Sequence, residues 1–393
     1  MISNSNPKCT GCRTCENICP KNCIRLVENN EGFLFPNIDL EKCIKCNKCS
    51  EHCPINHEYK FEDEIKQKYY LSYNRNKKEL MNSSSGGVFY VVAKNIIKNN
   101  GIVFGVTMDS NMQVLHCAVQ TYDELNKLVG SKYVQSNVND TYKIVKKYLL
   151  EGRYVLYTGT PCQIAGLKMY LFNDYSNLYT IDILCHGVPS QKMFSSHIKW
   201  LEQRYNKKIQ YFKFRNKHVS KWGDYYYCYK FTNNDKINSG NALCDVFFKS
   251  FIKEQIFRDS CYSCKYASLH REGDFTIGDF WGVKQYYPDI DIHDGISIFI
   301  INTNKGNTLF ENIKDDLVYR ETKIEWVMHN NHNLSQPASK PIEREKIFKY
   351  IETNGYNQWA SNYCHSKEYI IKKLSSKTPK LLKRVVKLMI HKK

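Results

Sequence analysis

A cysteine pattern that occurs twice in the first 54 residues constrains this chain more than any other feature. Each copy has three cysteines separated by two residues, and a fourth cysteine followed by proline comes three residues later. A triplet with this spacing can hold one 4Fe-4S cluster, and the fourth cysteine ligates the other cluster, as in bacterial two-cluster ferredoxins. We therefore predict two 4Fe-4S clusters, one held by Cys9, Cys12, Cys15 and Cys53 and the other by Cys43, Cys46, Cys49 and Cys19.

Zinc is the main alternative for a group of cysteines. Structural zinc usually binds two cysteine pairs that are separated by a long gap. A triplet with a distal Cys-Pro, present twice, favours iron and sulfide instead. Cys23 lies outside the pattern, and we interpret it as a small apolar side chain packed beside a cluster.

Composition limits the class of protein. The chain has 393 residues and 17 cysteines, which in a long chain indicate metal binding rather than a disulfide scaffold. We expect a cytoplasmic protein, because the N-terminal residues show no signal-peptide pattern and no apolar run approaches membrane-spanning length. The net charge is +18, but no nucleic-acid-binding motif accompanies it, so we expect no nucleic-acid partner.

Two polar segments carry features of an anion-binding site. Residues 82–87 form a Ser/Gly cluster before a helical apolar pattern, which predicts either a phosphate cradle or an ordinary serine N-cap. Residues 130–136 combine a lysine with hydroxyls and could hold a second phosphate or a ribityl chain, or form a solvated loop. The candidate binding residues are Ser84, Ser85, Gly86, Gly87, Ser131, Lys132, Gln135 and Ser136.

Alternating strand and helix patterns predict an α/β layered domain over roughly residues 68–310. Strands are expected near residues 69–73, 101–107, 112–119, 154–158, 178–184, 212–217 and 295–302, with a helix at 142–150. Ligands of open α/β sheets gather where strands end. Thr158, Thr160 and Cys162 are therefore well placed for a site.

Four further cysteines could form a third cluster. Cys162 and Cys185 lie at predicted strand ends, and Cys261 and Cys264 form a CxxC pair. Their spacing is compatible with a third 4Fe-4S cluster and equally with buried structural cysteines.

The last residues differ from the rest of the chain. Residues 331–393 hold few strand signals, and the segment from Thr378 onward reads as a basic amphipathic helix. Such a helix can contact an anionic membrane peripherally, bind a partner or dock on its own domain.

Six motifs together resemble the beta-subunit family of coenzyme F-420 hydrogenases and dehydrogenases, over roughly residues 5–305. They are SSSGG (83–87), GSKYVQS (130–136), TGTPCQIAGL (158–167), DILCHGVPS (182–190), SCYSC (260–264) and TIGDFWG (276–282). The resemblance implies an FAD-containing iron–sulfur protein that exchanges electrons with a two-electron carrier, which is coenzyme F-420 in methanogens. It also implies that the third set of cysteines ligates a cluster. Fused proteins of this kind are often associated with polysaccharide assembly.

We therefore expect an α+β ferredoxin-like two-cluster domain (1–60), an α/β layered flavoprotein domain (61–330) and a helical, basic C-terminal tail (331–393). FAD would join the one-electron chemistry of the clusters to a two-electron substrate, with the polar segments and Thr160 as its binding residues. Lys132 and His186 are candidate catalytic residues, and a redox protein or a soluble two-electron carrier is the expected partner. The alternatives are an electron-transfer subunit without substrate chemistry and a scaffold protein in polysaccharide assembly.

Overall fold

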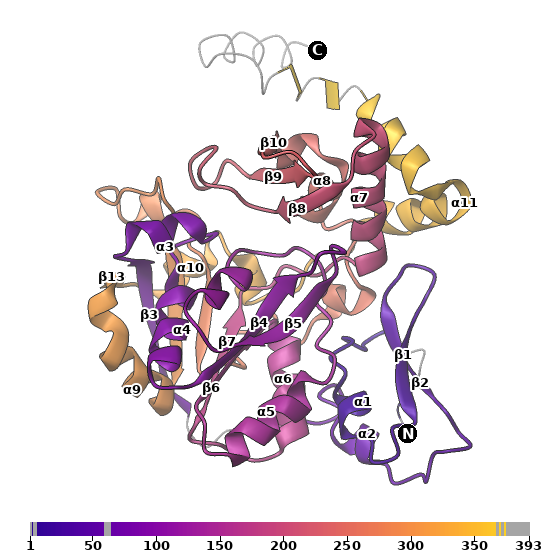
Figure 1. Ribbon diagram of the computed structural model, residues 1–393. Coiled ribbons are helices and arrows are strands. Elements are labelled where there is room, and N and C mark those ends of the chain that lie inside the picture. The colour runs from indigo at the N-terminus through magenta and orange to yellow at the C-terminus, as the bar shows by residue number, and fades with distance from the viewer. Residues whose placement is uncertain (1, 3–5, 59–63, 367–368, 371–372, 375–393) are drawn as a thin grey trace.

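The computed structural model describes residues 2, 6–58, 64–366, 369, 370, 373 and 374 (Figure 1). The predicted amphipathic helix after Thr378 lies outside these residues. In the part of the chain that is described, no helix is long and apolar enough to cross a membrane.

The N-terminal region is a small α+β unit, in which an antiparallel hairpin lies beside two short helices. These elements are α1 (Thr14–Ile18), β1 (Ile24–Glu28), β2 (Leu34–Ile38) and α2 (Lys48–Glu51). The repeated cysteine pattern becomes a repeated backbone geometry. Gly11 and Arg13 flank Cys12 with φ of 70° and 65°, and Lys45 and Asn47 flank Cys46 with φ of 56° and 59°. These left-handed residues bend each short cysteine loop sharply.

A mixed eight-stranded sheet forms the larger domain, in the order β13-β3-β12-β11-β7-β6-β4-β5. Strands β4, β6, β7 and β11 run parallel to one another, and the remaining neighbours pair antiparallel. The strands are β3 (Glu64–Asn74), β4 (Ile102–Met108), β5 (Val114–Val119), β6 (Val155–Gly159), β7 (Leu178–Ile183), β11 (Phe275–Asp279), β12 (Ser297–Thr303) and β13 (Leu317–Glu321). The predicted α/β architecture is thus confirmed, and the edge strand β13 extends it beyond residue 310.

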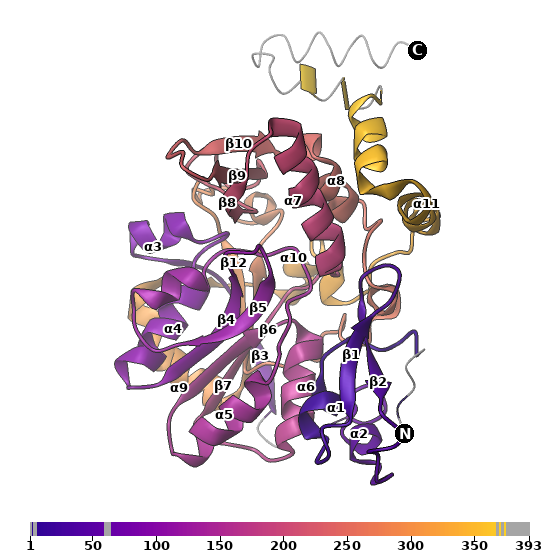
Figure 2. The same ribbon diagram turned by 45° about the vertical axis from the view of Figure 1, so that its right-hand side comes forward.

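Helices cover both faces of this sheet. On one face, α4 (Val88–Lys98) and α9 (Asn304–Ile313) bury an apolar core that includes Val92 and Phe299. On the other, α5 (Thr141–Leu150) and α6 (Pro161–Leu171) pack on a second core around Tyr157. Figures 1 and 2 both place the N-terminal unit beside α6 and far from α4.

A second, three-stranded antiparallel sheet lies above the main one (Figure 2). It contains β8 (Ile209–Lys213), β9 (Tyr226–Phe231) and β10 (Asn238–Asn241). Its apolar core is shared with α7 (Gln191–Tyr205), α8 (Val246–Ile252) and α11 (Glu343–Cys364). Of this sheet, the sequence predicts only a strand at 212–217, which overlaps the last two residues of β8.

Two further short helices are α3 (Lys77–Asn82) and α10 (Ile324–Met328), and α10 packs on another apolar core of the main sheet through the buried Val327. The C-terminal part of α11 changes direction at Gly355, whose φ is 80°. The described part of the C-terminal tail is therefore helical, as expected, and it packs against α7 and α8.

Candidate functional site

The four cysteines predicted for the first cluster lie together. The pKa of Cys15 is raised well above its usual value, and burial is the largest cause. The nearby thiols of Cys12, Cys9 and Cys53 raise this pKa further. Cys53 belongs to the second copy of the motif, so the arrangement is the crossed one that the spacing predicts. That these thiolates ligate one cluster stays a prediction.

The second set lines a recess of about 370 Å³ beside the hairpin, a volume that includes space open to solvent. The lining cysteines are Cys19, Cys23, Cys43, Cys46 and Cys49. The fifth member, Cys23, is buried, and its Sγ lies 3.4 Å from the Sγ of Cys19. The interpretation of Cys23 as a small side chain packed beside the cluster site agrees with this position.

The third set, Cys162, Cys185, Cys261 and Cys264, also lines one recess, of about 650 Å³ including space open to solvent. Cys162 lies in the first turn of α6, where Thr160 and Gln163 form a capping box and Pro161 occupies the first helical position. Cys185 follows the end of β7. Because β6 and β7 are parallel neighbours, the segments after their carboxyl ends meet at one edge of the sheet.

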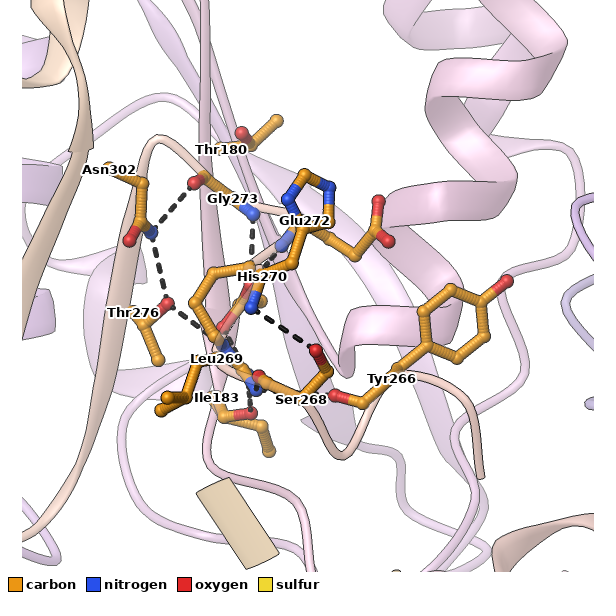
Figure 3. Close-up of polar contacts among 12 residues, drawn as sticks. Thr180, Ile183, Tyr266, Ser268, Leu269, His270, Glu272, Gly273, Thr276 and Asn302 are labelled. Atoms are coloured by element: carbon orange, nitrogen blue, oxygen red, sulfur yellow. Dashed lines mark hydrogen bonds and ion pairs between the residues drawn. The ribbon is translucent and has the colours of Figure 1, made fainter. Parts of the chain in front are cut away.

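A buried ion pair fixes the segment that follows the CxxC pair. Arg271 donates to Asp182 of β7 at 2.7 Å, and neither side chain is more than 1% exposed. The same guanidinium also donates to the carbonyl oxygens of Tyr266 and Ser268 and to the Thr276 hydroxyl. Figure 3 shows the labelled residues of this loop, from Tyr266 to Gly273, beside Ile183 and Thr276. Cys264 is thereby held beside the end of β7.

The chemistry of this recess fits a bound cluster. Burial raises the pKa of all four thiols, to about 12 for Cys261. Thiolates are the form that binds metal, so a cation must offset the cost of burying them. Arg258 partly opposes the shift at Cys261, and Arg271 does so at Cys185 and Cys264.

A single metal ion fits the cysteines less well. Within the described ranges, no three His, Cys, Asp or Glu side chains are grouped tightly enough to hold one ion. A cubane distributes its cysteines over separate iron atoms, so its ligands need not converge on a single point.

The first and third cysteine sets meet across α6. A Cβ built on Gly166 would lie 2.9 Å from the Cβ of Cys12 and 2.8 Å from the Thr14 hydroxyl. The Thr14 hydroxyl in turn donates to the Gly166 carbonyl at 2.8 Å. Gly166 is one helical turn after Cys162, so the absence of a side chain there lets the first cysteine loop approach the helix that carries Cys162.

Arg258 reinforces this contact from the other side. Its guanidinium donates to the Cys9 carbonyl at 2.7 Å and to the Leu34 carbonyl at 2.9 Å. It also lies over the Phe35 ring, 4.3 Å from the centroid. Arg258 is only 1% exposed to solvent. It therefore links the ferredoxin unit to the third recess from inside the protein. Arg258 is not predictable from the sequence, because nothing in its local sequence distinguishes it from a surface arginine.

The residues predicted to bind FAD fall into two groups. Ser84 accepts a hydrogen bond from the Ser131 backbone N–H at 2.7 Å, so the two polar segments do meet. Gln135, Ser136 and Thr160 instead line the third cysteine recess.

The glycines of the Ser/Gly cluster have a packing role. A Cβ on Gly86 would lie 2.4 Å from the Ser72 carbonyl oxygen, and its N–H donates to the Ser297 hydroxyl. Gly86 therefore lets the backbone approach the sheet, and its N–H already has a protein partner. Gly87 is the N-cap of α4, with φ of 75°. Ser85 also contacts the sheet, donating to the Ile296 carbonyl.

The two candidate catalytic residues differ in environment. Lys132 donates to the carbonyl oxygens of Lys127, Leu128 and Val129, and burial lowers its pKa to about 7. His186 is exposed at the mouth of the third recess. The structure does not bring these two side chains into contact in any described interaction.

Further cations lie near the joined polar segments. Lys217 donates to the carbonyl oxygens of Leu80, Ser85 and Asp294, and burial, then Arg215, lowers its pKa to about 7. Lys213 donates to the Asn82 carbonyl. The sequence signal for Lys217 was the pair of cations at the end of the predicted strand at 212–217, whereas Lys213 had no separate signal.

Comparisons with known proteins identify the two parts of the chain. Residues 152–326 match the family described as the C terminus of the coenzyme F420 hydrogenase/dehydrogenase beta subunit, and residues 8–57 and 35–84 match 4Fe-4S dicluster domains.

Three individual proteins illustrate these matches. A coenzyme F420-dependent sulfite reductase of Methanocaldococcus jannaschii is 26% identical over 184 residues, which is 46% of this chain and 28% of the relative. An NADH-quinone oxidoreductase subunit I of Geobacter metallireducens is 36% identical over 59 residues, 14% of this chain and 45% of the relative. A solved structure, the F420-reducing [NiFe] hydrogenase complex of Methanosarcina barkeri, aligns with a TM-score of 0.43 at 15% identity, covering 76% of this chain and 92% of that chain.

The chain spans less than half the length of the curated relatives named above. The family resemblance inferred from the motifs is confirmed. The chain thus joins an N-terminal segment that matches 4Fe-4S dicluster domains to a segment that matches the C terminus of the coenzyme F420 hydrogenase/dehydrogenase beta subunit.

Proposed function

We propose that this iron–sulfur protein is a flavin-dependent oxidoreductase, with a third 4Fe-4S cluster between its dicluster domain and FAD. The observation that carries the proposal is the contact between Cys12 and Gly166, one turn from Cys162 on α6. This contact places Cys12, a predicted ligand of the first cluster, against the helix that carries Cys162, a predicted ligand of the third. Electron transfer between the two clusters requires such proximity.

Each predicted cluster has a defined set of cysteines. The third would be held by Cys162, Cys185, Cys261 and Cys264, with Arg258 and Arg271 offsetting the buried negative charge. Because these cysteines come from three separate segments, a cluster there would also cross-link the larger domain.

FAD would supply the conversion between one-electron and two-electron chemistry. The proposed site for its diphosphate is the junction of Ser84 and Ser131, near the N-terminus of α4. Lys132, Lys213 and Lys217 support it, because burial lowers the pKa of each and the Lys213 charge lowers the pKa of the other two further. An anion placed among these ammonium groups would relieve both costs.

The partner in two-electron transfer is proposed to be a soluble hydride carrier. Coenzyme F-420 is one candidate, since a relative that matches this domain is named for it. The association with polysaccharide assembly stays a prediction from the resemblance. His186, exposed at the recess mouth, stays a candidate for contact with substrate.

The test is anaerobic purification of the full chain and of a Cys261→Ser/Cys264→Ser variant. Wild type should contain about twelve iron and twelve sulfide per chain, and the variant about eight of each. A Cys117→Ser/Cys244→Ser variant is the matched control, because neither cysteine belongs to the three sets, and it should keep wild-type iron.

The absorbance spectrum separates the remaining alternatives. Flavin bands released on denaturation support the flavoprotein. Clusters without flavin would favour an electron-transfer protein that lacks substrate chemistry. A folded wild-type chain with about eight iron would remove the third cluster from the proposal.

A further inference from the structure

One predicted cluster site reaches the molecular surface. Among the cysteines assigned to the three sets, Cys46 is exposed, and the others are buried or half-buried. The first set faces α6 through Cys12, and the third lies within the larger domain. The second set is therefore the one that an external protein can approach most closely.

The surface around Cys46 is apolar at two prominent positions. Leu40 is 68% exposed and Ile44 is 57% exposed. Both belong to the loop that carries Cys43 and Cys46, and neither is covered by another part of the described chain. Exposed apolar side chains surrounded by polar residues mark many protein-docking sites.

The charged residues of this site have one sign. Lys21, Lys45 and Lys48 line the recess of the second set, and no acidic residue lines it in the described chain. The neighbouring Asp39 is paired with Lys42 at 2.7 Å. Glu41 and Glu51, the next acids along the chain, do not line the recess either. A basic patch with an apolar centre complements an acidic protein surface.

We propose that this surface docks a small, acidic one-electron carrier protein. We call it the entry surface, and it comprises Lys21, Leu40, Ile44, Lys45, Cys46 and Lys48. The inference rests on the proposed function and names the partner of its dicluster domain. One electron leaves the carrier, which is oxidised, and one enters this chain, which is reduced; no covalent bond forms or breaks.

Binding is tested with the holoprotein and an acidic bacterial two-cluster ferredoxin in its oxidised form. Calorimetry at low and high salt should show affinity that falls as ionic strength rises. Lys45→Glu/Lys48→Glu should weaken binding at low salt by about tenfold or more. Ile44→Ser should weaken it at both salt concentrations, because the apolar contact is not screened.

The matched control is Lys98→Glu/Lys199→Glu. Lys98 ends α4 and Lys199 lies on α7, both exposed, and the net charge changes by the same amount. Figure 1 shows α4 on the opposite side of the molecule from α2. The control should bind ferredoxin nearly as wild type does. An equal loss in both double variants would overturn the proposal, because only net charge would then matter.

A second readout follows reduction by stopped-flow absorbance. Reduced ferredoxin should bleach the iron–sulfur bands of the Lys45→Glu/Lys48→Glu variant more slowly than those of wild type. Dithionite, which needs no docking surface, should reduce both alike. If that variant loses iron, Lys21→Glu carries the same test from outside the Cys43–Cys49 loop, with slower ferredoxin reduction expected.

Other outcomes separate the two proposals. Salt-independent ferredoxin binding would overturn the entry surface and leave the proposed function intact. Failure of dithionite to reduce a folded, iron-loaded chain would overturn the proposed function. Binding to phosphatidylserine vesicles that requires Lys45 and Lys48, without ferredoxin binding, would assign the surface to a membrane and overturn the proposal.

Discussion

Replacing Asp182 by asparagine should destabilise the larger domain and release the third cluster. One carboxylate oxygen of Asp182 accepts from Arg271 at 2.7 Å, and the other accepts from the N–H groups of Glu272 and Gly273 at 2.9 and 2.8 Å. An asparagine has one acceptor oxygen and one donor amide. In either orientation its NH₂ group therefore faces a donor, and the Arg271 charge loses its counter-ion.

The size of the effect follows from burial. Both side chains are at most 1% exposed, and removing one partner of a buried ion pair typically costs about 3–5 kcal/mol. With roughly 2–4 °C of melting temperature per kcal/mol for a domain of 150–250 residues, the expected decrease is roughly 6–20 °C. Because Arg271 also holds the loop after Cys264, the iron content should fall toward about eight per chain.

The assay is thermal unfolding by circular dichroism, together with iron and sulfide analysis, on anaerobically prepared full-length protein. Asp39→Asn is the matched control, because it is the same substitution in an exposed pair with Lys42. A control melting temperature equal to that of wild type is expected. An Asp182→Asn variant that melts with the control and keeps full iron would refute the role assigned to the buried pair.

Three further predictions test other contacts. Gly166→Val should displace the ferredoxin unit from α6, because even a Cβ at this position would clash with Cys12. Limited proteolysis should therefore cleave this variant faster than wild type. The control Gly152→Asn, at φ 76° with no atom near its Cβ, should be cleaved at the wild-type rate. Cys23→Ala should keep about four iron at the second site, and loss of that iron would identify Cys23 as a ligand. Flavin binding should take up protons and weaken as pH rises above about 7. The reason is that burial lowers the pKa of Lys217 to about 7 in the free protein, and a bound phosphate would raise this pKa. Calorimetry in buffers of different ionisation enthalpy measures the proton uptake, and flavin binding without proton uptake would contradict the lysine site.

The local parts of the fold were predictable, whereas the long-range ones were not. The strands at β4, β6, β7 and β12 follow from apolar runs bounded by turn residues. The convergence of Cys162 and Cys185 follows from the rule that ligands gather at the ends of parallel strands. These inferences need only nearby residues and one topological rule.

The second sheet and the long-range contacts could not be predicted without tertiary information. Strands β9 and β10 are rich in Tyr and Asn and lack a clear alternation, so their pairing depends on the core they share with α7. Arg258 and Cys9 are 249 positions apart, and no local pattern indicates such a contact. The Ser/Gly cluster was interpreted as a phosphate cradle or a cap, but Gly86 proved to be required by close packing on Ser72 and Ser297.

Helix α11, which packs against α7 and α8, also contacts the dicluster domain through Arg344, and this contact affects the order in which the protein is assembled. Arg344 forms a bidentate pair with Glu31, 313 positions earlier in the chain, and donates to the Phe257 carbonyl. During synthesis the dicluster domain emerges from the ribosome long before this arginine exists. Its cysteine loops can therefore receive iron and sulfide while still accessible to a cluster-delivery protein. The contacts that Gly166 and Arg258 make with the dicluster domain can form as soon as those residues are translated, whereas the contact with α11 can form only at the end of synthesis.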